Sequence, residues 1–99
     1  MATYFRRDVW VKNQQGQAVA GAQIFLCQQP CNAWPTLQDG PPDPLQLTYS
    51  DPLGQVALPQ PVITDGFGWA AVYALPGFYT LLVYSGGKLM QQYPDQLLG

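Results

Sequence analysis

Residues 64–83 carry the clearest turn and strand signals of this chain and read TDGFGWAAVYALPGFYTLLV. Their first part repeats the pattern of residues 50–57, SDPLGQVA: a hydroxyl residue, an aspartate, two variable residues, a glycine and, one residue later, small apolar residues. An aspartate side chain accepts hydrogen bonds from backbone amides that follow it, and glycine adopts positive φ without steric penalty. The repeat therefore predicts two tight turns, with Asp51 and Asp65 as caps and with Gly54 and Gly68 at positive φ.

Strand signals follow the second turn and recur along the chain. Residues 69–74 and 78–85 are rich in β-branched and aromatic residues, and Leu75-Pro76-Gly77 forms a turn between them. Ten glycines and ten prolines are spread so widely that few windows favour a helix. Further strands are predicted at residues 4–12, 22–28, 45–50, 56–61 and 88–93. The fold class expected is all-β, an antiparallel β-sandwich of about seven short strands.

The length and composition fit one domain over residues 1–99. The chain is 47% hydrophobic and 13% aromatic, enough to build a core. A proline-rich insert at about residues 31–44 lies within this domain, and no linker divides the chain. The N-terminal segment lacks the positive-then-apolar order of a signal peptide, so we expect the chain to be made in a cytoplasm.

Charge limits the classes of partner. Only 10% of residues are charged, the net charge is −2, and Arg6-Arg7 is the one basic pair. Nucleic-acid binding needs several phosphate contacts, so nucleic acid is not expected as a partner. No apolar stretch is long enough to span a bilayer, so no membrane is expected either. So few charges do little to keep a protein monomeric, which favours contact with other proteins.

Catalytic and metal-binding patterns are missing from the sequence. The chain has no histidine, which excludes Ser-His-Asp and Cys-His catalysis and the usual zinc sites. Calcium prefers oxygen ligands, but Asp39, Asp43, Asp51 and Asp65 lack the dense acidic alternation of a calcium loop. We therefore expect no enzyme activity, no cofactor and no metal.

The cysteines and aromatic residues leave alternatives open. Cys27 and Cys31 are spaced one residue wider than a redox or zinc pair, and either free thiols or a small disulfide loop fits them. Several aromatic residues fit either a sugar-binding platform or sheet packing, and sheet packing is favoured because large aromatics dominate the burial of small domains. These residues are Trp10, Trp34, Trp69, Tyr73, Phe78 and Tyr79.

The order of motifs resembles the transthyretin-like, carboxypeptidase-regulatory-like β-sandwich, a prealbumin- or Ig-like fold. The motifs that carry the resemblance are VWV (9–11), AVAGAQIFL (18–26), TDGFGWAAVY (64–73) and LPGFYTLLV (75–83). Residues 49–65 are similar to a segment of small modules in tailed-phage virion proteins, where the sandwich is a building block of fibres, collars and decorations. The resemblance implies a structural protein that binds other capsid, neck or tail subunits.

The expected partners are therefore other virion proteins, in a homo-oligomer or a larger assembly, and the expected location is the virion. An extracellular adhesion or carbohydrate-binding module is the alternative. The predicted contacts come from the insert and its flank and from the last strand, which would lie at a sheet edge able to pair with a neighbour. These interface residues are Trp34, Leu37, Leu45, Leu47, Lys88, Met90 and Tyr93.

Overall fold

A computed structural model describes residues 3–99; Met1 and Ala2, which begin the segment compared with a signal peptide, lie outside it. The described chain is all-β and antiparallel, as the sequence predicts. No helix among these residues is long and apolar enough to cross a membrane. The elements are β1 (Phe5–Trp10), β2 (Gln23–Asn32), the 3₁₀ turn η1 (Leu37–Asp39), β3 (Asp43–Leu45), β4 (Val62–Ile63), β5 (Trp69–Ala74), β6 (Gly77–Ser85) and β7 (Lys88–Leu98).

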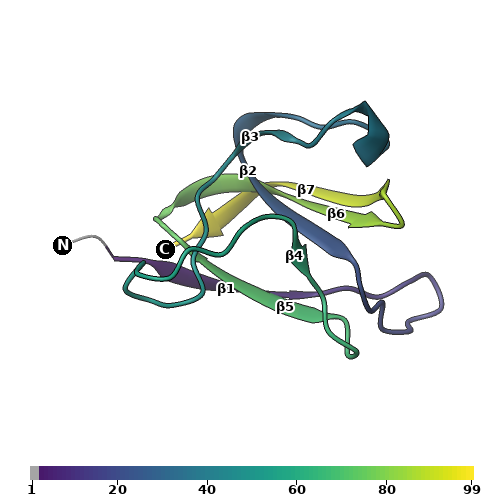
Figure 1. Cartoon of the computed structure of the whole chain (residues 1–99), viewed down its shortest axis with the longest axis horizontal. Helices are drawn as coiled ribbons and strands as arrows, with labels where there is room; N and C mark the ends of the chain where they lie inside the picture. Colours follow the sequence, from purple (N-terminus) through teal and green to yellow (C-terminus); the bar gives the residue numbers. More distant parts are fainter. Residues whose placement is uncertain (1–2) are drawn as a thin grey trace.

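The strands form two layers (Figure 1). One layer is the two-stranded sheet β1–β5, in which Trp10 lies opposite Trp69. The other is a five-stranded sheet of order β3-β2-β6-β7, with β4 also pairing with β2. The chain crosses between layers at the predicted turn of Leu75, Pro76 and Gly77, because β5 and β6 belong to different sheets. The Tyr79 hydroxyl donates to the Leu75 carbonyl at 2.6 Å and so fixes this crossing.

Period-two alternation explains the main core. Val9 and Val11 face inward from the β1 segment, and Ala70, Val72 and Ala74 do so from β5. The larger sheet contributes Ile24, Leu26, Leu81, Val83 and Leu98 to the same cluster. Fully burying one aliphatic side chain stabilises a protein by roughly 1.5–3 kcal/mol, so this cluster holds the two layers together.

A second, smaller cluster covers the opposite face of the larger sheet. It contains Phe25, Cys27, Leu82 and Tyr84, with the Phe25 and Tyr84 rings edge-to-face at 5.5 Å. The insert folds back over these residues, and the Tyr84 hydroxyl donates to the Trp34 carbonyl at 2.6 Å. Residues 24–27 of β2 and 79–84 of β6 are thus buried on both faces.

The two aspartate turns have the predicted geometry. Gly54 and Gly68 adopt φ of 68° and 74°. Asp51 Oδ1 accepts from the amides of Gln55 and Val56 at 3.0 and 2.8 Å. Asp65 Oδ1 accepts from the amides of Phe67 and Trp69 at 2.8 and 3.1 Å.

Four predicted strands are wrong in extent. The strand predicted at residues 22–28 continues to Asn32, into the predicted insert. Residues 45–50 do not form one strand, because β3 ends at Leu45 and Tyr49 makes only isolated bridges. Residues 56–61 are not a strand; the short β4 follows them, and the Gln60 side chain bonds the Leu26 amide and carbonyl instead. The last strand does not end at Tyr93, because β7 continues to the buried Leu98.

The insert is tied locally by a covalent bond. Cys27 and Cys31 form a disulfide in β2, with their Cα atoms 5.9 Å apart. Of the alternatives left open by the sequence, the structure therefore has the small disulfide loop. A loop this short constrains the unfolded chain less than a long-range bridge does.

Candidate functional site: an exposed aromatic face and its groove

The outer face of the β1–β5 sheet carries aromatic and charged side chains that lie opposite one another on the two strands. Because successive strand residues point to opposite faces, Arg6, Asp8 and Trp10 point outward from β1. Trp69, Ala71 and Tyr73 point outward from β5. The Trp10 and Trp69 rings are 6.2 Å apart, and Trp10 is 63% exposed.

Asp8 organises the charges on this face. Its Oδ1 lies 3.0 Å from Arg6 Nη2 and also accepts from Trp69 Nε1 at 3.0 Å. The Arg6 guanidinium lies 5.6 Å from the centre of the Trp69 ring, within cation–π range. The hydrogen bond with Arg6 is the main cause that lowers the pKa of Asp8, and the same bond raises the pKa of Arg6. Both groups are therefore charged at neutral pH.

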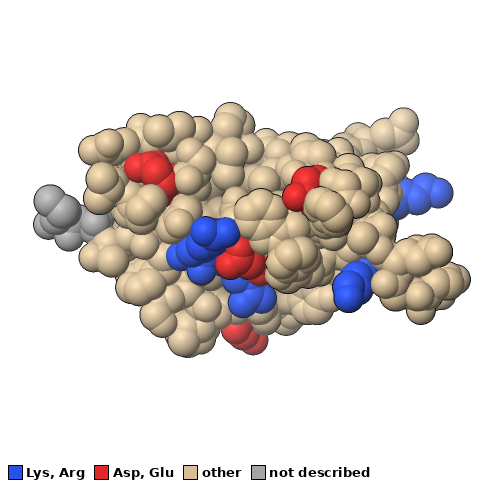
Figure 2. Space-filling view, turned by 90° about the horizontal axis from the view of Figure 1, so that it is seen from below, with Lys and Arg blue, Asp and Glu red and all other residues tan. Residues whose placement is uncertain are grey.

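Charge is otherwise sparse on this side of the molecule. Figure 2 shows blue and red atoms meeting near the centre of the face, while most of the surrounding surface is uncharged. Phe67, in the second aspartate turn, is 79% exposed. An aromatic surface with one central ion pair is suited to binding a ligand that presents both apolar and hydrogen-bonding groups.

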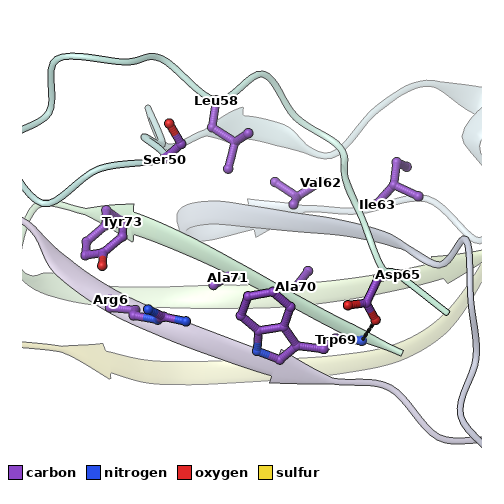
Figure 3. Close-up of a pocket in the computed structure, with 10 residues that line it drawn as sticks. All are labelled: Arg6, Ser50, Leu58, Val62, Ile63, Asp65, Trp69, Ala70, Ala71 and Tyr73. Atoms are coloured by element: carbon purple, nitrogen blue, oxygen red, sulfur yellow. Dashed lines mark hydrogen bonds between the residues drawn. The ribbon is translucent and has the colours of Figure 1, made fainter. Parts of the chain in front are cut away.

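A groove of about 380 Å³ runs beside this face. In Figure 3 the side chains of Arg6, Trp69 and Tyr73 lie along one side of it, and those of Leu58, Val62 and Ile63 lie on the opposite side. Ser50, Asp65, Ala70 and Ala71 complete the lining. The walls are mainly apolar.

The backbone of Ala71 is open to this groove. Tyr73 exchanges both backbone hydrogen bonds with Tyr49, and Trp69 accepts from the Asp65 amide. These partners lie on the edge of β5 away from β1, and by antiparallel alternation the N–H and C=O of Ala71 point to the same edge. Within residues 3–99 these Ala71 groups have no backbone partner on that edge.

The groove offers few polar side chains besides its apolar walls. The groove is lined by one carboxylate, Asp65, which caps its own turn, and by two hydroxyl residues, Ser50 and Tyr73. Among residues 3–99 no group of three or more His, Cys, Asp or Glu side chains could hold a metal ion. Stacking, apolar contact and backbone hydrogen bonding are the interactions that this surface offers.

The predicted interface residues do not form one surface. Leu37 and Leu45 pack against the second cluster, and Met90 packs against the main core. Trp34, at 45% exposure, and Leu47, at 72%, remain accessible, as do Lys88 and Tyr93. Leu37 of the insert and Leu45 of its flank therefore pack within their own domain, because they cover the apolar outer face of β2 and β6.

The sequence suggested part of the aromatic face but not its charged members. Trp10, Trp69 and Tyr73 were candidates for a platform, and they do share a face, whereas Tyr79 is buried and Trp34 lies on the insert. The pairing of β1 with β5 brings Arg6 and Asp8 beside them. The sequence feature that could have placed Arg6 and Asp8 on this face is the alternation of inward and outward residues in both strands.

Comparison with protein-family models, with curated proteins and with solved structures found no match to this chain. The resemblance to transthyretin-like modules therefore stays a prediction.

Proposed function

We propose that this chain is a non-enzymatic structural protein that binds other subunits of a tailed-phage virion, as a decoration or accessory subunit of the head, neck or tail. The observation that carries the proposal is the amount of large apolar side chain left exposed on a chain with only 10% charged residues. Large apolar groups at the surface favour protein interfaces when they form patches. The most exposed of them are Trp10, Leu47, Leu53, Val56, Ile63, Phe67, Phe78 and Leu97.

Two of these residues form a cross-strand pair. Phe78 of β6 lies opposite Leu97 of β7, at the end of the larger sheet that the insert does not cover. Large apolar cross-strand pairs usually pack beneath another layer of the protein. Phe78 and Leu97 do not belong to the second cluster, which the insert covers. A neighbouring subunit seated on this end would bury both side chains.

A second candidate function is carbohydrate binding, favoured by the outer face of β1 and β5. Trp10, Trp69 and Tyr73 offer aromatic surfaces beside the carboxylate of Asp8. Aromatic surfaces pack against the apolar faces of sugars, and a carboxylate accepts from their hydroxyls. Quenching of tryptophan fluorescence by glycans, lost in Trp10→Ala, would favour this function over the first.

The first proposal is tested by locating the chain in purified virus particles made from the genome that encodes it. Tandem mass spectrometry is expected to find it in particles, and microscopy to place a small β-sandwich on the head, neck or tail. Its absence from purified particles would contradict the proposal. Specific glycan binding in the same experiments would support the alternative.

A further inference from the structure

Strand β1 has one unpaired edge. The hydrogen bond from the Val11 amide to the Gly68 carbonyl, at 2.8 Å, marks Val11 as a bonded position opposite β5. By antiparallel alternation Val9 and Arg7 are bonded to β5 as well, whereas the N–H and C=O groups of Arg6, Asp8 and Trp10 point the other way. Over the part of the chain that the structure describes, those groups have no backbone partner. The edge is exposed at all three residues.

The corresponding edge of the larger sheet is protected. The insert covers the start of β7, because Leu37 donates to the Gly87 carbonyl at 2.7 Å and Leu89 donates to the Pro35 carbonyl at 2.8 Å. Farther along, Pro94 has no amide hydrogen and Asp95 adopts a positive φ of 58°, which interrupts the strand. Covering segments, proline and irregular backbone are the usual ways in which proteins block edge pairing. The sequence-based choice of β7 as the pairing edge is therefore less well supported than β1.

Arg7 provides a charged group beside the open edge. It points inward with Val9, and its Nη2 donates to Gln96 Oε1 of β7 at 2.7 Å. Its Nε is buried and has no hydrogen-bond partner, and among residues 3–99 no carboxylate lies within salt-bridge distance of it. The Asp8 carboxylate points to the other face and is held by Arg6. A half-buried guanidinium without an anion is costly and is suited to a carboxylate supplied from outside.

A cavity of about 250 Å³ joins these features. It lies between β1 and the larger sheet and is lined by Arg7, Asp8, Val9, Trp10, Leu81 and Tyr93. An added strand beside β1 would alternate its side chains in the same way as β1 does. Its inward side chains would enter this cavity, where Leu81 and Val9 favour apolar groups and Arg7 favours an acidic one.

We propose that the β1 edge binds an extended segment of a partner protein as an added strand, and that an Asp or Glu of this segment pairs with Arg7. This inference rests on the proposed function of subunit binding and names the edge and the chemistry of the partner. Backbone bonds at Arg6, Asp8 and Trp10 give the affinity, and the alternating apolar and acidic inward side chains give the specificity.

The test selects peptides from a ribosome-displayed library of random sequences about twelve residues long, enough to span a typical strand. Selected peptides are expected to alternate β-branched and polar residues and to carry an acidic residue at one inward position. On binding, the amides of Arg6, Asp8 and Trp10 are expected to gain protection from hydrogen exchange, measured by NMR. Those of Arg7 and Val9, which are already bonded, are expected to change little.

Two variant pairs isolate the two parts of the proposal. Asp8→Pro removes the edge N–H, whereas Asp8→Ala removes only the carboxylate, so the proline variant should bind the peptides at least about tenfold more weakly than the alanine variant. Arg7→Gln should weaken binding roughly tenfold to a hundredfold, as expected for one charge-assisted hydrogen bond, while Arg7→Lys should retain part of it. Far-UV circular dichroism confirms that each variant folds, and Lys12→Gln controls for loss of one positive charge.

Selected peptides without acidic enrichment, or protection confined to β7, would overturn the inference. So would equal peptide affinity of Asp8→Pro and Asp8→Ala. If Asp8→Pro and Arg7→Gln lose peptide binding but still join virus particles, the edge is not the assembly contact and the proposed function stands. If the wild-type protein binds such peptides but is absent from particles, the proposed function alone fails.

Discussion

At the scale of single residues, two glycines of the second aspartate turn, Gly66 and Gly68, differ in whether a side chain fits. Gly68 has φ of 74°, and a Cβ there would lie 2.5 Å from the Val11 carbonyl oxygen. Gly66, in the same turn, has no heavy atom within 4 Å of a Cβ position and no positive φ in the restricted range. The turn thus needs glycine at one position and accepts side chains at the other.

Gly68→Ala is expected to lower the free energy of unfolding by roughly 1–3 kcal/mol, through backbone strain and the contact with Val11. Gly66→Ala, the matched control, should leave it nearly unchanged. Urea denaturation followed by tryptophan fluorescence measures both. Equal stability of the two variants would show that the backbone at Gly68 is not strained.

Asp51 couples the first turn to pH. Hydrogen bonds from backbone amides, that of Val56 first, lower the pKa of its carboxylate below the usual value. A lowered folded-state pKa stabilises the fold above the unfolded pKa of about 3.9, and this contribution is lost as pH falls through the folded pKa. Asp51→Asn keeps the acceptor oxygen but not the titration, so its urea midpoint should fall less than that of the wild type between about pH 5 and pH 2. Equal pH dependence in both proteins would contradict the role of Asp51.

At the scale of elements, β7 closes the core and is not a detachable arm. Leu98 is 3% exposed and belongs to the main cluster, whereas its neighbour Leu97 is 57% exposed. Deleting residues 88–99 would uncover the core, so such a deletion is expected to impair folding at least as much as assembly.

Leu98→Ala is expected to destabilise the protein by about 2–5 kcal/mol, the usual cost of truncating a buried leucine. Leu97→Ala removes the same atoms from the surface and should change the free energy of unfolding by less than about 0.5 kcal/mol. Thermal and urea unfolding of the pair measure the difference. Similar losses in both variants would show that the end of β7 is not buried as described.

At the scale of the whole molecule, the insert has two roles. Its Leu37 side chain covers the outer face of the larger sheet, and its Trp34 side chain remains 45% exposed. Of these two side chains, only that of Trp34 is available for contact with another subunit. A standard interface buries about 800 Å² per partner, which needs more than one exposed side chain.

Trp34→Ser is expected to weaken association between subunits with little change in melting temperature. Leu37→Ser is expected to lower stability by about 1–2 kcal/mol, because it removes cover from the second cluster. Sedimentation velocity at high protein concentration, alone and with other virion subunits, measures association. A wild-type protein that stays a monodisperse monomer and binds no virion subunit would contradict a contact through Trp34.

Local sequence determined the turns and the fold class. Asp51, Gly54, Asp65 and Gly68 specify their turns through bonds to residues at most five positions away, so the pattern alone is sufficient. Alternation in residues 69–74 likewise fixed which side chains of β5 face the core. Such short-range chemistry does not depend on the remainder of the fold.

Only the tertiary structure decided which strands meet and what covers each face. The aromatic face requires β1 to pair with β5, more than sixty residues away along the chain at Arg6 and Tyr73. The inward packing of Leu37 and the burial of Leu98 likewise depend on distant apolar surface that must be removed from water. Hydrophobic burial is non-directional and acts between any segments that the fold brings together. The sequence pattern therefore marked residues able to be buried or exposed, and the packing of the two sheets chose among them.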